Sequence, residues 1–92
     1  MNELRIQKVQ FAGDEMTVQF SDGCQIALFV SCFPRLMAAS VAERNAWQLI
    51  GRGLGVHWDS VDEDLSVENI LTAYSRSRKD AYASSHLVTT KS

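Results

Sequence analysis

Apolar and polar residues alternate along the first thirty positions, which is the pattern of β-strands with one buried face. The alternation begins at Leu4, changes parity near Gln7 and Lys8, and resumes at Val9. A change of parity inside one strand indicates a bulge. A second alternating strand over residues 16–20 follows a Gly-Asp turn, so the two segments predict an antiparallel hairpin.

A third strand is predicted over residues 24–30, after a turn of Ser, Asp and Gly. Ile26 and Leu28 lie on one face of this strand, while Ala27 and Phe29 make the other face unusually apolar. Such a strand is typical where a helix or another subunit covers the second face. Phe29 is therefore a candidate partner-binding residue.

The strand pattern ends near Pro34, which suits the first turn of a helix. Ser40 and Glu43 have the spacing of a capping box, which predicts a short helix. A longer helix is expected from about Ser66, where Asp64 or Ser66 itself can form the N-cap. Its apolar stripe consists of Val67, Ile70, Leu71 and Tyr74.

Two further short strands are predicted over residues 46–51 and 56–58, on either side of a run with glycine at every second position. The run matches neither the dinucleotide-binding fingerprint nor a phosphate-binding loop. Its plainest interpretation is a turn or bulged ribbon, and a ligand-cradling loop is the alternative. Arg52, between two glycines, could meet a carboxylate or phosphate, although an exposed ion pair with the acidic segment that follows is commoner.

The pattern as a whole predicts an α+β fold. A small antiparallel sheet, made of a three-stranded N-terminal meander plus two short strands, is packed with one or two helices. Residues 1–74 are expected to form a single domain, and residues 75–92 a polar helix extension and a flexible C-terminal tail. The predicted core consists of Val18, Phe20, Ile26, Leu28, Trp47, Leu49, Trp58, Ile70 and Leu71.

Composition and charge exclude several classes of protein. The chain has 92 residues, 46% of them hydrophobic and 22% charged, which suits one small domain with a buried core. The net charge of −2 gives no general attraction to nucleic acid, so direct binding to nucleic acid is not expected. No apolar run is long enough to span a membrane, and no signal peptide is evident, so the expected location is cytoplasmic.

The candidate chemical groups do not form a recognisable active site. His57 and Asp59 share a strand parity and so could share a face, but no nucleophile accompanies them. A structural histidine, packed by Trp58 and hydrogen-bonded at one nitrogen, is the simpler interpretation. Cys24 and Cys32 fit no CxxC or zinc spacing and are expected to be reduced and mostly buried. We therefore expect no enzyme activity and no cofactor or metal.

The acidic segment over residues 59–64 is predicted to be a connector. It lacks the calcium-loop pattern, and its simplest role is to precede the last helix. Its negative surface also suits a basic partner, which makes Asp62, Glu63 and Asp64 candidate partner-binding residues. Arg52, exposed on the glycine run, and His57, at the end of the corner that begins at Gly51, are further candidate partner-binding residues. Arg76, Arg78 and Lys79 are more typical of a solvated helix end than of a nucleic-acid site.

Several of these segments together resemble the bacterial family catalogued as domain of unknown function 2442. The resemblance covers roughly residues 4–73. It is carried by the run from Trp47 to Trp58, by the segment from Asp62 to Glu68 with Ile70 and Leu71, by the hairpin Phe20-Ser21-Asp22-Gly23, and by Pro34-Arg35-Leu36.

The resemblance implies a small α+β protein with an antitoxin or regulatory role. Some similar proteins carry an added helix-turn-helix domain, and others are encoded beside a small toxin-like partner. No catalytic residues can be carried over. This chain has no helix-turn-helix pattern after residue 74.

Three functions therefore remain open. The first is a non-catalytic protein-interaction module, acting as a homodimer or with a small basic protein partner, in an antitoxin-like or regulatory role. The second is a DNA-associated regulator that works through a dimer or a partner. The third is a small-ligand or enzymatic role at the corner between Gly51 and His57.

Overall fold

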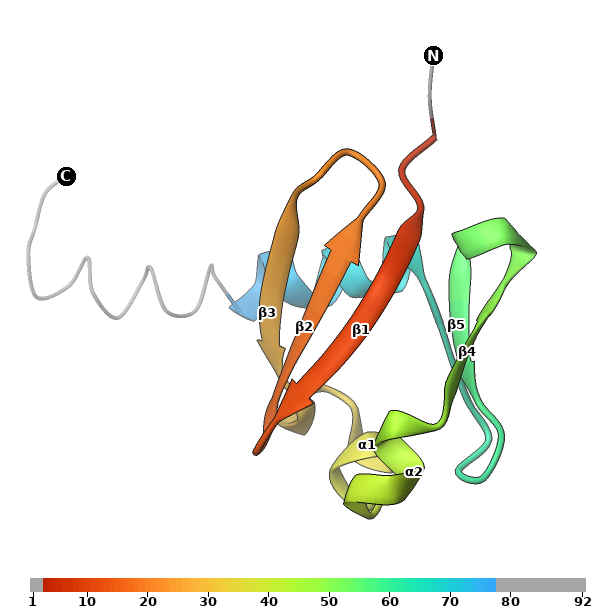
Figure 1. The fold of residues 1–92 in the computed structure, drawn as a ribbon. Helices are drawn as coiled ribbons and strands as arrows, with labels where there is room; N and C mark the ends of the chain where they lie inside the picture. Colours follow the sequence, from red (N-terminus) through yellow and green to blue (C-terminus); the bar gives the residue numbers. More distant parts are fainter. Residues whose placement is uncertain (1–2, 78–92) are drawn as a thin grey trace, which may run out of the picture.

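The computed structural model describes residues 3–77 and contains two small antiparallel sheets with helices packed against them (Figure 1). Sheet A has the order β1-β2-β3, formed by Ile6–Ala12, Glu15–Phe20 and Gln25–Phe29. Sheet B has the order β4-β5-β6, formed by Trp47–Ile50, Gly55–Trp58 and Glu63–Ser66. The predicted α+β class is confirmed.

Sheet A is the meander that the sequence predicts. Its register shifts between Ile6 and Lys8, where the change of parity indicated a bulge. In β2, Met16, Val18 and Phe20 are all buried, and the intervening positions face outward. The two-residue side-chain period thus gives the sheet one core face and one outer face.

Short helical segments connect the two sheets. They are η1 (Val30–Cys32), α1 (Pro34–Met37) and α2 (Val41–Asn45). The predicted capping box at α2 is confirmed, since Glu43 donates its backbone N–H to Ser40 Oγ at 3.1 Å and Ser40 donates its own to the Glu43 carboxylate at 2.8 Å.

The glycine run forms a turn between β4 and β5 that contains η2 (Gly51–Gly53), and the predicted turn is confirmed. Gly53 has φ +91°, and a Cβ placed there would lie 2.7 Å from the carbonyl oxygen of Ile6. Only glycine therefore lets this turn approach β1 so closely. Arg52 also has positive φ, at 58°.

The sequence prediction is wrong for Glu63 and Asp64, which begin strand β6 rather than complete a connector. β6 pairs antiparallel with β5 and places Leu65 in the core. A four-residue strand with one buried apolar side chain carries too little alternation to be recognised in an acidic sequence.

A helix covers residues 67–77 at the end of the described chain. Ser66 caps it as predicted: Asn69 donates its backbone N–H to Ser66 Oγ at 2.9 Å, and Ser66 donates its own to the Asn69 side chain at 3.1 Å. The predicted boundary at residue 74 falls inside this helix. Residues 78–92 of the expected helix extension and tail lie outside the described residues.

The core lies between the inner faces of the two sheets. Of the predicted core, Val18, Phe20, Leu28, Trp58 and Ile70 are buried, and Trp47 and Ile26 are half-buried. The prediction of burial is wrong for Leu49 and Leu71, since each is 39% exposed. Leu49 belongs to β4, an edge strand of sheet B, so neighbours cover it on one side only.

Arg44 in α2 is a buried charged residue that sequence reasoning did not identify. Its guanidinium donates to the carbonyl oxygens of Leu36, Met37 and Gly13 at 2.9–3.1 Å, and it pairs with Asp14 at 3.3 Å. These four hydrogen bonds, and the negative charge of the carboxylate, compensate for the burial of the charge, since Arg44 is only 7% exposed.

Candidate functional site

The predicted partner-binding residues lie on two separate surfaces. Phe29 belongs to sheet A, whereas Arg52, His57, Asp62, Glu63 and Asp64 lie along sheet B and its turns. Strand β3, which carries Phe29, and strand β5, which carries His57, stand on opposite sides of the fold (Figure 1). The six residues therefore do not form one site.

Phe29 is a large apolar side chain on the outer face of an edge strand. It is 62% exposed and lies opposite Glu15 of β2. β3 is the last strand of sheet A, and no described strand pairs with its other side. The predicted second apolar face of this strand is therefore present, and within the described residues Phe29 is left largely uncovered.

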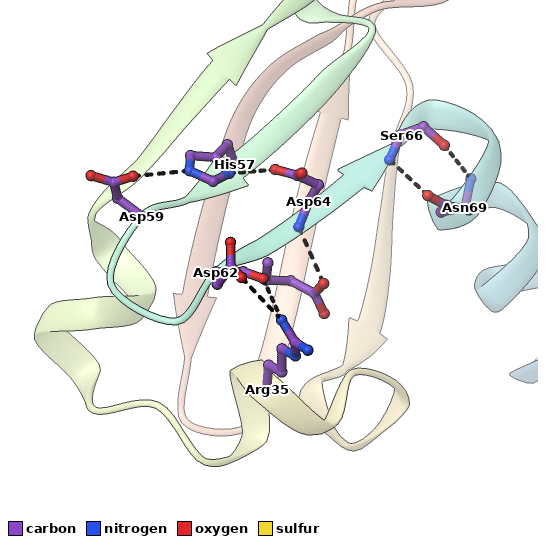
Figure 2. Close-up of polar contacts among 8 residues, drawn as sticks. Arg35, His57, Asp59, Asp62, Asp64, Ser66 and Asn69 are labelled. Carbon is purple, nitrogen blue, oxygen red and sulfur yellow. Dashed lines mark hydrogen bonds and ion pairs between the residues drawn. The ribbon is translucent and has the colours of Figure 1, made fainter.

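His57 lies between two carboxylates on the outer face of sheet B (Figure 2). Its Nδ1 is hydrogen-bonded to Asp64 Oδ1, and its Nε2 lies 3.0 Å from Asp59 Oδ1. The predicted pairing on one face with Asp59 is confirmed. The prediction of a single hydrogen bond is wrong, because β6 was not predicted and it brings Asp64 directly opposite His57.

The expectation that Trp58 packs His57 is also wrong. The two are neighbours on β5, so they point to opposite faces of sheet B: Trp58 is fully buried and the His57 side chain is 24% exposed.

The two carboxylates favour a protonated imidazole. A carboxylate only accepts hydrogen bonds, so both ring nitrogens must carry a proton to bond both partners. The hydrogen bond to Asp64, then that to Asp59, raises the pKa of His57 above its ordinary value of 6.5, with partial burial acting in the opposite direction. In this arrangement neither ring nitrogen is available to take a proton from a substrate.

Asp62 and Glu63 are engaged near the β5–β6 turn. Arg35 of α1 donates to the carbonyl oxygen of Asp62 at 2.6 Å and pairs with its carboxylate at 3.7 Å (Figure 2). Glu63 accepts the backbone N–H of Asp64 at 3.1 Å. Arg52 is held through its backbone: its carbonyl oxygen accepts a hydrogen bond from the Arg5 guanidinium at 2.9 Å. The ion pair expected for its side chain is not formed within residues 3–77.

A hollow beside this cluster lies at the corner between Gly51 and His57, where the sequence left a small-ligand site open as an alternative, although its lining by β6 was not predicted. It has a volume of about 300 Å³ and is lined by Ile50, Gly51, Leu54, Gly55, Asp64, Leu65, Ser66 and Asn69. Ile50, Gly55 and Ser66 form one cross-strand row, and Gln48, His57 and Asp64 form the next. The signal in the sequence was Ile50: it is apolar but lies on the same face of the predicted strand as polar Gln48, which indicates an apolar spot on an otherwise polar face.

Other expected or excluded groups can be placed. Cys24 is exposed and Cys32 half-buried, both as free thiols, so the prediction of burial is wrong for Cys24, which follows the β2–β3 turn. Within residues 3–77, no group of three or more His, Cys, Asp or Glu side chains is arranged to hold a metal ion. No helix in this range is long and apolar enough to cross a membrane.

The fold and these surfaces define a small α+β domain built from two three-stranded antiparallel sheets. The chain belongs to the family described as "Protein of unknown function (DUF2442)", whose model matches residues 6–75. The resemblance drawn from the Trp- and Gly-rich segment is thereby confirmed.

A solved structure shares this fold. The chain is similar to a protein of unknown function from Rhodospirillum rubrum ATCC 11170, known from a crystal structure, with 29% sequence identity and a TM-score of 0.68. The similarity covers 77% of this chain and 88% of that one. No curated protein matches the sequence.

Proposed function

We propose that this domain is a non-catalytic protein-interaction module, which binds a second copy of itself, a small basic protein, or both. An antitoxin-like or regulatory role is one form of this function. The observation that carries the proposal is Phe29, an aromatic side chain 62% exposed on an edge strand.

An edge strand offers unpaired backbone N–H and C=O groups to another chain. Single exposed apolar residues are common on protein surfaces and need no explanation by themselves. Phe29 differs because it lies at such an edge, where a side chain of an added strand would pack against the ring. The core is closed without it, since Leu28 on the other face of the same strand is 2% exposed.

The chemistry of the described residues supports a binding role rather than a reaction. Within residues 3–77, His57 is the only histidine, and each of its two ring nitrogens is hydrogen-bonded to a carboxylate. The acids around it give sheet B a negative edge that would steer a basic partner toward the domain.

Sedimentation velocity over a concentration series tests the proposal. Wild-type protein should form a dimer, or bind a protein recovered from its native host, and Phe29→Asp should weaken that association about tenfold or more. Val41→Asp is the matched control, because Val41 is an apolar side chain 72% exposed on helix α2 and not on the edge of a sheet. It should associate like wild type.

Two results would overturn the proposal. One is a wild-type monomer at the highest concentration together with no recovered partner. The other is a Phe29→Asp protein that associates as tightly as Val41→Asp. Circular dichroism of both variants shows whether each keeps the native fold.

A further inference from the structure

We propose that the hollow on the outer face of sheet B is a docking site for a basic segment of a partner protein. One apolar side chain of that segment enters the hollow, and a neighbouring Lys or Arg meets Asp64 and Asp59. This inference rests on the proposed binding function, and it concerns a surface separate from Phe29.

The shape of the hollow follows from Gly55 in the central strand. Gly55 has no side chain, and its cross-strand neighbour Ile50 leans over it, with Ile50 Cγ1 3.2 Å from the position that a Cβ would take. Leu54 lines the hollow as well. Ile50 and Leu54 remain 42% and 38% exposed, so their apolar surface is available to an incoming side chain.

Charge identifies the kind of partner. Asp64 is the charged residue that lines the hollow, and its side chain is 68% exposed although it also bonds His57. Asp59, on the far side of the imidazole, is 87% exposed. Two carboxylates share one imidazolium, so the cluster of Asp59, His57 and Asp64 beside the hollow carries a net negative charge that a Lys or Arg complements.

Size favours a side chain over a metabolite. The hollow holds about 300 Å³, at the lower limit for pockets that bury a small ligand. Its polar groups are also largely occupied: Ser66 and Asn69 bond each other in the helix cap. A ligand rich in polar groups would find few free partners, whereas an aliphatic or aromatic side chain needs none.

The geometry also predicts a variant that binds more tightly. His57 competes with the partner's cation for Asp64 and Asp59. Replacing it with Gln removes the positive charge and leaves both carboxylates in place, so the affinity for a basic segment should rise. A purely structural role for this cluster would give unchanged or weaker binding.

A phage-displayed library of random dodecapeptides, selected on the 92-residue chain, provides the probe. The enriched peptides should carry Lys or Arg beside Leu, Ile, Phe or Met. The best of them, made synthetically, should lose affinity about tenfold for Ile50→Gln and for Asp64→Asn, and should gain affinity for His57→Gln. Methyl NMR should place the contact at Ile50 and Leu54.

Matched controls separate the hollow from general effects. Leu49→Gln removes a neighbouring leucine of similar exposure, 39%, from the opposite face of β4. Asp22→Asn removes an acid from the β2–β3 turn of sheet A. Both should bind the peptide as wild type does. If Ile50→Gln loses its native circular dichroism, Leu54→Gln takes its place.

Several results would overturn the inference. These are no enrichment, enrichment without basic residues, or binding that is indifferent to Ile50→Gln and Asp64→Asn. A small molecule that copurifies with wild type and is lost from Ile50→Gln would also overturn it, because the occupant would then be a metabolite. If any of these results is obtained while association still depends on Phe29, the hollow is not a docking site, and the proposed function still stands.

Discussion

Trp58 donates its indole N–H to the backbone carbonyl oxygen of Arg44 at 2.9 Å. The contact joins the middle sheet B strand to α2, and both residues are buried. The indole ring also packs edge-on against Phe11, with ring centroids 6.4 Å apart. One side chain thus contacts β1 of sheet A and the helical connection between the sheets.

Trp58→Ala should lower the free energy of unfolding by about 3–5 kcal/mol, since a fully buried ring leaves a cavity that its neighbours cannot fill. Urea denaturation measures the loss. Trp58→Phe is the control: it keeps most of the apolar volume but not the N–H, and should cost about 1–3 kcal/mol. An alanine variant as stable as wild type would show that the ring is not part of the core.

Arg44→Leu should cost about 3 kcal/mol, because it removes the hydrogen bonds that a buried guanidinium donates to the carbonyl oxygens of Leu36, Met37 and Gly13, of which the Leu36 oxygen still accepts the backbone N–H of Ala39. Asp14→Asn should cost less than about 1 kcal/mol, because the Asp14 carboxylate is 67% exposed and solvent screens the ion pair. Chemical denaturation of both variants tests the difference. Equal losses would mean that the ion pair, and not the carbonyl contacts, is the source of stability.

Gly53→Ala should be far more destabilising than Gly13→Ala. Both glycines have positive φ, so each alanine carries a backbone penalty of about 1–2 kcal/mol. At Gly13 an added Cβ meets nothing within 4 Å, whereas at Gly53 it lies 2.7 Å from the Ile6 carbonyl oxygen. Melting temperatures of the two variants provide the test, and equal values would contradict the close approach of η2 to β1.

The protonation of His57 should stabilise the fold at acidic and neutral pH. Its pKa is raised by Asp64 and then by Asp59, so the contribution is complete below the unfolded value of 6.5 and is lost as pH rises through the higher folded value. NMR titration of the His57 ring should report the raised pKa. Asp64→Asn should lower it more than Asp59→Asn, and a folded pKa below 6.5 would contradict the geometry.

Local patterns in the sequence predicted sheet A and the helix starts correctly. The bulge near Lys8, the capping box at Ser40 and the cap at Ser66 each depend on residues within a few positions of one another. Such signals do not require knowledge of the tertiary structure, so the sequence contains them in full.

The parts that were missed depend on contacts between distant segments. β6 is short and acidic, and only its pairing with β5 makes it a strand. Without β6, Asp64 could not be placed against His57, nor the hollow recognised beside Ile50. Arg44 looked like an ordinary polar residue of a short helix, because its partners at Gly13 and Asp14 are remote in sequence.

The contacts of Arg44 also bear on how the protein unfolds. Its guanidinium holds the β1–β2 turn and α1 together, and its carbonyl accepts from Trp58 of sheet B. Neither sheet can separate without breaking bonds at this residue. Opening should therefore be cooperative, so amide protons in the centres of β2 and β5 should exchange with solvent at a common free energy, which native-state hydrogen exchange would measure.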